Sequence, residues 1–583
     1  MALSPLESEK LARLIQVARG RAKADLVIRG GSIFDVFSGR FVPGDLAIWE
    51  DRLAGVGPPG SYAGERELLV TGYLVPGFVD SHVHVESSLA SPQSLAPTLL
   101  ENGVTAVVAD PHEIVNVAGL LGLDYFLASA RVAAMDFFLT LPSCVPASNL
   151  EKGGSEVTAQ DLSPYFGRPG VLGLGEMMNY PGVLAGDPEV LAKLTLARSR
   201  GALIDGHAPM VGGLDLSALR ASGVSSDHEA ATVQEAVERL ERGFWLMIRE
   251  GTAARNLVGL WPAITRENAR FCLLATDDRH ARDLVNQGGV NYMISLAQNL
   301  SQIPLPDILR MATINPAQFF GFKDRGALAP GYLADLALYP DLTSWKPRKV
   351  WKNGRLVVDE GYLGSSKIQK ISLESGLLNS VRLAPLEPNS LKVPATGSQV
   401  RVIGLKPDQI VTDSLKLSWP ARAGFYEAEP GLGIVKMAIW NRYGGDGVAK
   451  VGFLKGLGLQ RGALAQTISH DSHHLVAAGV EDADILLAAR TVVNMGGGLA
   501  LAAGGQVLGT LALPLGGLMS NAPLREIAQI LEGLDQVCHQ LGTEPGRDPF
   551  LTLGFMSLPV IPRLKLTVAG LVEDFQIVDL VSP

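Results

Sequence analysis

Two histidines stand two positions apart near residue 80, in the stretch PGFVDSHVHVESS. In an extended strand, side chains i and i+2 point to the same side, so His82 and His84 are expected to project together. Taken alone, such a pair is more typical of two hydrogen-bonded structural histidines than of two metal ligands.

Four further polar residues favour the metal interpretation, because each ends an apolar run far along the chain: Glu176, His207, His228 and Asp277. Neutral imidazole and carboxylate groups suit Zn, Fe or Mn. Six ligands exceed the need of one catalytic ion that keeps an open position. The pattern therefore predicts a two-metal centre in which a carboxylate such as Glu176 can bridge both ions.

The elements that must position these residues are eight short apolar runs that alternate with helical segments. Eight such βα units predict a parallel α/β fold, a TIM-type (β/α)8 barrel, whose active site lies at the carboxyl ends of the strands. The runs cover residues 74–84, 104–113, 136–144, 170–179, 202–207, 223–228, 244–251 and 271–278.

The segments on either side of the predicted barrel have a different sequence pattern. Short β-like pieces with turns occur both before residue 75 and after residue 326, which predicts one small β-sandwich domain built from both sides. A separate mixed α/β domain is expected at the C-terminus. The predicted division is 1–75 (helix and first part of the β-domain), 76–325 (barrel), 326–365 (second part), 366–395 (connector) and 396–583 (C-terminal domain).

Composition narrows the class of protein. The chain has 583 residues, 47% of them hydrophobic, and a net charge of −9, which argues against nucleic-acid binding. Three scattered cysteines exclude a disulfide framework and a CxxC zinc site, and suit the cytoplasm. No signal peptide and no apolar run of about 20 residues is seen, so no membrane partner is expected. A homo-oligomer, dimer or larger, is expected.

Other polar clusters are weaker candidates for substrate contacts or helix caps. They are Glu86 after the HxH run, Asp110, His112 and Glu113 in ADPHE, and Asp278 beside Asp277. Glu86 and its two serines are equally well explained as the N-cap of the next helix. A loop with His470, Asp471, His473 and His474 could bind a further ion, close the pocket, or be a polar loop at a domain interface.

Longer stretches carry a specific resemblance. GEMMNYPGVL, GHAP, GVSSDHEA and ATDDRH, with NRYGGDG and SHDSHH near the C-terminus, resemble the adenine deaminase family of the amidohydrolase superfamily over nearly the whole chain. The resemblance implies that His82, His84 and Asp277 bind one metal, that His207 and His228 bind the other, and that Glu176 bridges them. It favours Mn or Fe over Zn. No lysine ends the fourth strand, which favours a Glu-bridged subgroup.

The resemblance also implies hydrolytic deamination of adenine, a purine base, to hypoxanthine and ammonia in purine salvage. Metal binding lowers the pKa of water from about 15.7 towards 7, so a metal-bridging hydroxide can attack the ring. Asp277 could act as general base and then as general acid, with Glu176 completing the catalytic pair. The alternatives are another amidohydrolase acting on a cyclic amide or a different aminopurine, and a catalytically inactive scaffold.

One stretch departs from the family pattern. Where adenine deaminases often carry an EGHID-like sequence, this chain has NQGGVN, with Gly289 and Asn291 in place of the His and Asp. If this stretch shapes the pocket, substrate preference or rate is expected to differ.

Overall fold

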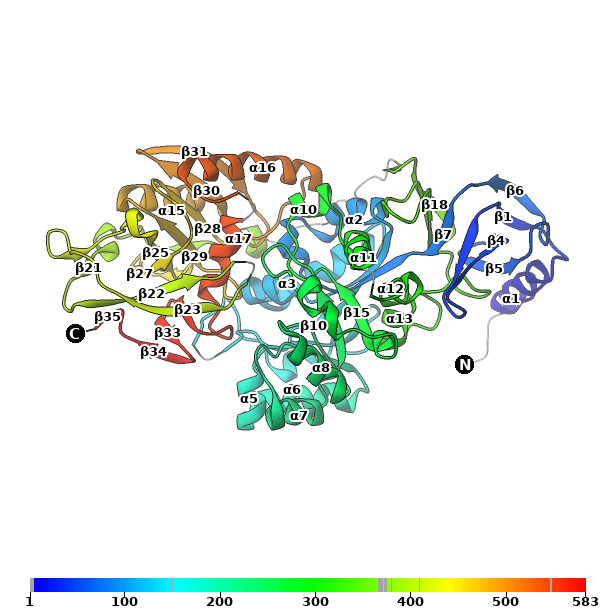
Figure 1. Cartoon of the computed structure of the whole chain (residues 1–583), viewed down its shortest axis with the longest axis horizontal. Coiled ribbons are helices and arrows are strands. Elements are labelled where there is room, and N and C mark those ends of the chain that lie inside the picture. Colours follow the sequence, from blue (N-terminus) through cyan, green and yellow to red (C-terminus); the bar gives the residue numbers. More distant parts are fainter. Residues whose placement is uncertain are drawn as a thin grey trace.

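The computed structural model describes residues 5–148, 150–300, 302–364, 371, 375–378, 380–407, 409–545 and 548–582. Three parts follow one another along the long axis of the molecule (Figure 1): N-terminal sheets at one end, a central α/β part, and a C-terminal part at the other end. One continuous apolar core contains residues of both the central and the C-terminal part, such as Leu95 and Leu464.

The central part is built on parallel strands. Five of them form one sheet in the order β12-β11-β10-β9-β8, and three form another in the order β13-β14-β15. Their bounds are β8 (Phe78–Val83), β9 (Val104–Ala109), β10 (Asp136–Leu141), β11 (Val171–Met177), β12 (Leu203–Gly206), β13 (Ser226–Asp227), β14 (Trp245–Arg249) and β15 (Cys272–Ala275). All eight expected runs therefore contain a strand.

Backbone hydrogen bonds connect these two parallel sheets at both edges. The Ser225 amide donates to the Ile204 carbonyl at 2.9 Å, and the Asp277 amide donates to the His82 carbonyl at 2.9 Å. The sheet is therefore curled, and the carboxyl ends of its strands converge.

Helices connect and cover these strands, which are buried on both faces as parallel strands normally are. The main ones are α2 (Pro92–Glu101), α3 (His112–Val132), α6 (Pro188–Ser199), α7 (Gly213–Ser222), α8 (Val233–Glu241) and α11 (Val290–Asn299). Among the described helices, α3 alone is long and apolar enough to cross a membrane by composition. Since 67% of that stretch is buried inside the protein, we describe it as a core helix.

The first expected run, 74–84, is not one strand, and that expectation was wrong. β7 (Tyr73–Pro76) belongs to a different sheet, and β8 starts only at Phe78. Gly77 lies between them, and a Cβ there would come within 2.2 Å of the Thr105 hydroxyl oxygen. The chain passes from one sheet to the other where only glycine fits.

The N-terminal part contains helix α1 (Pro5–Ala18) and two sheets, one with the order β5-β4-β1-β6 and the other with the order β19-β18-β17-β16-β7-β2-β3. The second sheet combines strands from both flanks of the central part. The bounds are β1 (Ala24–Arg29), β2 (Ser32–Asp35), β3 (Arg40–Pro43), β4 (Asp45–Trp49), β5 (Arg52–Gly57), β6 (Gly64–Leu69), β16 (Leu336–Tyr339), β17 (Lys349–Lys352), β18 (Arg355–Asp359) and β19 (Tyr362–Leu363).

The C-terminal part is a mostly antiparallel sheet with the order β23-β22-β27-β25-β29-β28-β30-β31, and β35 (Val581–Ser582) pairs with β22. Its strands are β22 (Gln399–Leu405), β23 (Thr412–Leu417), β25 (Ile434–Trp440), β27 (Lys450–Lys455), β28 (Ala463–Gln466), β29 (Leu475–Gly479), β30 (Gly498–Ala503) and β31 (Gln506–Ala512), with helices α15 (Asp482–Asn494), α16 (Leu524–Leu541) and α17 (Pro549–Gly554). Residues 467–474 connect β28 to β29. The expected connector, 366–395, lies partly outside the described residues.

Candidate metal centre

The structure brings all six candidate ligands together at the carboxyl ends of the central strands. His82 lies on β8 and His84 directly after it, and Glu176 lies on β11. The others immediately follow or nearly follow a strand: His207 after β12, His228 after β13 and Asp277 after β15. All six are buried.

Glu176 stands between the two groups of histidines. Its Oε1 lies 3.2 Å from His84 Nε2, and its Oε2 lies 2.8 Å from His207 Nδ1 and 3.0 Å from His228 Nε2. Asp277 Oδ1 lies 3.2 Å from His84 Nε2. One carboxylate thus faces donors on two sides, which is the arrangement that a bridge between two cations needs.

Neighbouring oxygens fix the orientation of the first two imidazoles. The Nδ1 of His82 lies 2.9 Å from Asp205 Oδ2, and the Nδ1 of His84 lies 3.1 Å from the Asp110 carbonyl oxygen. A carbonyl oxygen and a carboxylate accept, so both Nδ1 atoms donate. In the neutral rings, both Nε2 atoms then carry lone pairs.

These two lone-pair nitrogens lie only 3.1 Å apart. Two acceptors that face each other at this distance repel, and a cation between them removes the repulsion. The geometry therefore fits a metal ion. Several groups of three potential ligand atoms also lie within 4.8 Å of one another. Two of these groups are His82 with His84 and Glu176, and Glu176 with His207 and His228. Histidine and carboxylate donors suit divalent transition metals.

Arg249, at the end of β14, adds a fixed positive charge. Its Nη1 donates to Asp277 Oδ2 at 3.1 Å and its Nη2 donates to Glu229 Oε2 at 3.0 Å. Burial opposes ionisation of Asp277, but the hydrogen bond to His84 and the charges of His228 and Arg249 hold its pKa well below the usual value. Asp277 also has φ +54°, a strained backbone for a non-glycine residue, which is common at functional sites.

Two residues that were predicted to contact substrate, Asp110 and Glu86, do not line the cavity and instead accept hydrogen bonds from nearby backbone amides. Asp110 Oδ2 accepts from the Glu176 amide at 2.9 Å, and the neighbouring Gly175 leaves room for it, because a Cβ there would lie 2.1 Å from that oxygen. Glu86 Oε1 accepts from the Ile114 amide at 3.1 Å, in the first turn of α3. Glu86 is therefore a helix cap, as one interpretation expected, but of α3 and not of the next helix, α2. Burial raises its pKa to about 7.

Most of the remaining predicted residues, His473 and His474 excepted, line a small cavity of only about 20 Å³. A cavity of this volume holds about one water molecule. The central part contributes His112, Glu113, Met178, Glu229 and Asp278 beside Arg249 and five of the six candidate ligands, all but His82, and the C-terminal part contributes Ile410, His470, Asp471, Phe555 and Leu558.

Glu113 connects the two sides of this cavity. Its Oε1 lies 2.5 Å from His470 Nδ1, and its other oxygen pairs with His473 Nε2. Burial opposes ionisation of Glu113, but the charges of His470 and His473 hold its pKa well below the usual value. His470 also stacks on Phe555 at 4.2 Å, and its Nε2 has no hydrogen-bond partner among the described residues. His474 is buried against Tyr443 and does not line the cavity.

The sequence argument missed Asp205 and Glu229. Asp205 lies two residues before His207 on β12, and Glu229 directly follows His228. The i, i+2 spacing around His207 was the available signal for Asp205. The departure at Gly289 and Asn291 lies away from the cavity lining: Asn291 Oδ1 accepts from the Gly289 amide at 3.0 Å, which shapes the turn before α11.

The chain matches the amidohydrolase family over residues 73–357 and the adenine deaminase C-terminal domain over residues 409–576. The parallel α/β part and its cluster of histidines and carboxylates thus place the protein among the amidohydrolases.

The whole chain narrows this class further. It is 45% identical to adenine deaminase 2 of Carboxydothermus hydrogenoformans over 96% of this chain and 97% of that protein. It is 43% identical to the adenine deaminase of Nitratidesulfovibrio vulgaris strain Hildenborough over 96% of both chains. It is 41% identical to the adenine deaminase of Desulfatibacillum aliphaticivorans over 96% of this chain and 97% of that protein. The chain belongs to the adenine deaminase family.

Proposed function

We propose that this protein catalyses the hydrolytic deamination of adenine to hypoxanthine and ammonia. The observation that carries this proposal is Glu176, whose two oxygens face His84 on one side and His207 with His228 on the other. We infer the reaction from membership of the adenine deaminase family, and this buried cluster is a centre that can perform it.

Two divalent cations, Mn or Fe with Zn as an alternative, are the cofactors that we propose for this cluster. His82, His84 and Asp277 would hold one and His207 and His228 the other, with Glu176 shared between them. The cations would supply Lewis acidity and activate water at neutral pH. Asp205 and the Asp110 carbonyl keep the imidazoles of His82 and His84 turned towards the centre.

Asp277 is the residue to which we assign proton transfer. It is ionised, because His84, His228 and Arg249 stabilise its negative charge. It can therefore accept a proton from the attacking water and later give one to the departing amine. Arg249 holds its Oδ2, which keeps the carboxylate in place while it is protonated. Water supplies the oxygen of hypoxanthine, and the amino group leaves as ammonia.

We assign the purine contacts to residues that line the cavity: His112, Glu113, Asp278 and His470. His470 is the most specific of these, because Glu113 fixes its Nδ1 and leaves its buried Nε2 free. Such an atom can hydrogen-bond a ring nitrogen of the base. Glu86 and Asp110 act indirectly, through α3 and Glu176.

The finer architecture is also part of the proposal. We propose that the eight central strands form a closed (β/α)8 barrel, supported by the hydrogen bonds at both edges of the two parallel sheets. The two flanks would form one small β-domain, supported by their shared seven-stranded sheet. Residues 467–474 would close the pocket from the C-terminal domain. The cytoplasmic location and a homo-oligomeric state stay predictions.

Metal titration tests the proposed function directly. Apo-protein would be reconstituted with Mn, Fe or Zn, and ammonia release would be measured from adenine and from a panel of other aminopurines and cyclic amides. We expect adenine to be the best substrate and activity to saturate at two metal equivalents. Saturation at one equivalent contradicts the two-metal centre, and a better substrate in the panel contradicts the assignment to adenine.

A variant pair tests the bridge. Glu176→Gln keeps the size of the side chain and removes its charge, and Glu241→Gln, at the exposed end of α8, is the matched control. We expect Glu176→Gln to lose bound metal and activity while the control keeps both. Full activity in Glu176→Gln contradicts the bridging role.

A further inference from the structure

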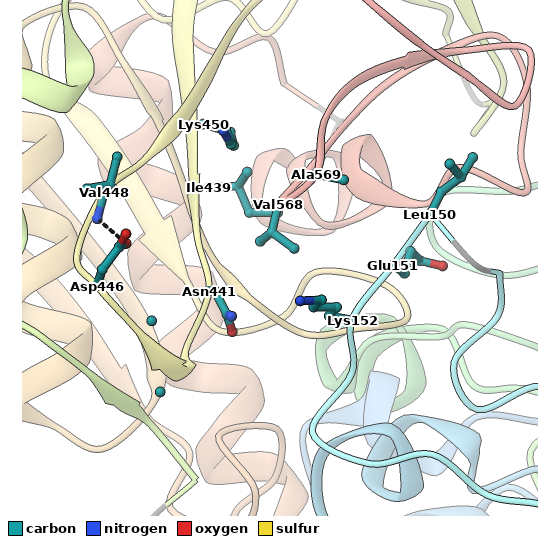
Figure 2. Close-up of a pocket in the computed structure, with 12 residues that line it drawn as sticks. Leu150, Glu151, Lys152, Ile439, Asn441, Asp446, Val448, Lys450, Val568 and Ala569 are labelled. Atoms are coloured by element: carbon teal, nitrogen blue, oxygen red, sulfur yellow. Dashed lines mark hydrogen bonds between the residues drawn. The ribbon is translucent and has the colours of Figure 1, made fainter.

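A second and larger cavity lies where the C-terminal part meets the loop at residues 150–152 (Figure 2). Its volume is about 550 Å³, within the range of small-molecule sites. Strand β25, strand β27 and the turn at Val568 and Ala569 form the other walls. No residue of this cavity belongs to the candidate metal centre.

The charges in this second cavity favour an anion. Lys152 and Lys450 enter it from different walls (Figure 2), and neither has an ion pair or hydrogen bond to its ammonium group among the described residues. The Asn441 side chain adds an amide, whose oxygen already accepts from the Tyr443 amide at 2.9 Å. Its nitrogen remains available as a donor.

Neither of the two carboxyl groups in the lining forms an ion pair with these lysines among the described residues. Asp446 Oδ1 accepts from the Val448 amide at 3.0 Å within its own turn. Glu151 is buried and accepts from the Ser472 hydroxyl at 2.8 Å. Burial and the neighbouring charge of Asp471 hold the pKa of Glu151 well above the usual value.

The walls of this cavity also include an apolar surface, and hydrogen bonds connect them to the loop that reaches the metal centre. Val568 lies between the two lysines (Figure 2) and is partly exposed, so a flat ring can pack on it, whereas the neighbouring Ile439 is buried. Glu151 and Tyr443 both hold Ser472, the second through a 2.7 Å hydrogen bond to the Ser472 carbonyl. The preceding residues, His470 and Asp471, line the small cavity at the metal centre.

We propose that this cavity binds a phosphate monoester of nucleotide size, with the phosphate on Lys152 and Lys450 and the ring on Val568. A bound ligand would stabilise the loop 467–474 through Glu151 and Ser472. The site is separate from the centre at which we place deamination, and it makes this loop responsive to a second small molecule.

The test measures binding to the full-length, metal-loaded protein by titration calorimetry, with AMP as the probe. Adenosine and inorganic phosphate are the two partial probes. We expect AMP to bind more tightly than either, and the K152Q/K450Q double variant to weaken AMP binding by about tenfold or more. The matched control replaces two exposed lysines outside the cavity, K323Q/K416Q, and is expected to bind AMP as the unaltered protein does.

Two results overturn the binding site: no heat at millimolar AMP, or equal AMP affinity in the two double variants. The latter would place AMP elsewhere, for example at the metal centre. Inorganic phosphate that binds as tightly as AMP would contradict the role of the apolar wall. These outcomes do not depend on ammonia release, so they are independent of the proposed deamination.

Amide hydrogen exchange tests the connection to the loop. We expect AMP to slow exchange in residues 467–474 of the unaltered protein and not in K152Q/K450Q. Lysine-dependent AMP binding with no change in this segment would contradict the coupling to the loop.

Discussion

The two sides of the small cavity are built in different ways. On the central side, each candidate ligand is held by a strand end whose backbone belongs to the parallel sheet. On the C-terminal side, His470 and Asp471 lie on a loop that contacts the central part through Glu113 and Glu151. One side is therefore set by strand ends and the other by the loop 467–474, which is called the cover below.

The largest expected effect on activity comes from a substitution on the central side, where strand ends hold the candidate ligands. Asp277→Asn removes the proposed proton carrier, which is also a proposed metal ligand, with almost no change in size, and general acid–base catalysis contributes about 10²–10⁴-fold. We expect kcat for adenine to fall by about 10³-fold. Steady-state ammonia release measures this, with Asp215→Asn, on α7 at the surface, as control. A change in KM with unchanged kcat would contradict a role of Asp277 in proton transfer.

Asp205→Asn should have a smaller effect on the same side. It weakens the hydrogen bond that orients His82, and loss of such a partner typically costs about 10- to 100-fold in metal affinity or activity. We expect metal affinity, measured by competition with a chelator, to fall within this range. Unchanged affinity would show that His82 is oriented by the fold alone.

On the cover, His473→Ala should act mainly on substrate binding. It removes one of the two imidazoles on Glu113 without touching the cavity lining. A hydrogen bond to a charged group contributes roughly 1.5–3 kcal/mol, so KM is expected to rise about tenfold while kcat changes less. His539→Ala on α16 is the control. A large fall in kcat with unchanged KM would mean that the cover belongs to the catalytic machinery.

The smallest effect concerns stability and pH. Lys565 is buried in the C-terminal part, where its Nζ donates to the carbonyl oxygens of two residues of the cavity lining, Ile410 at 2.8 Å and Phe555 at 2.9 Å. Burial lowers its pKa from 10.5 to about 7. Between these values the unfolded chain binds more protons than the folded one, so the free energy of unfolding rises with pH, by at most about 1.4 kcal/mol per pH unit for one proton.

We expect Lys565→Met to lose this slope between pH 7 and 10, and the exposed-site control Lys416→Met to keep it. Denaturant unfolding at several pH values measures both. Identical slopes in the two variants would mean that Lys565 stays charged in the folded protein.

The sequence predicted the central part well because its signal is local. Each candidate ligand ends an apolar run, and parallel strands bring such ends to one edge. The split at Gly77 could not be seen, because it depends on Thr105, which approaches from the neighbouring strand. The role of Glu86 was assigned to the wrong helix for a similar reason, since its partner Ile114 belongs to a later helix.

The cover was harder to predict than the central side. His470 and Glu113 meet across 357 positions of sequence, and no periodicity reports such a contact. The SHDSHH loop was recognisable as unusual, but three interpretations remained open until its neighbours were known. Packing between distant segments decided which of its histidines face the cavity.

The small volume of the cavity at the metal centre has a kinetic consequence. A space of about 20 Å³ holds about one water molecule, so the residues that line it must rearrange before a purine fits. If that rearrangement includes the loop 467–474, the rate of its opening is an upper limit on kcat. Faster variants should then be sought in the loop and its contacts before they are sought among the ligands.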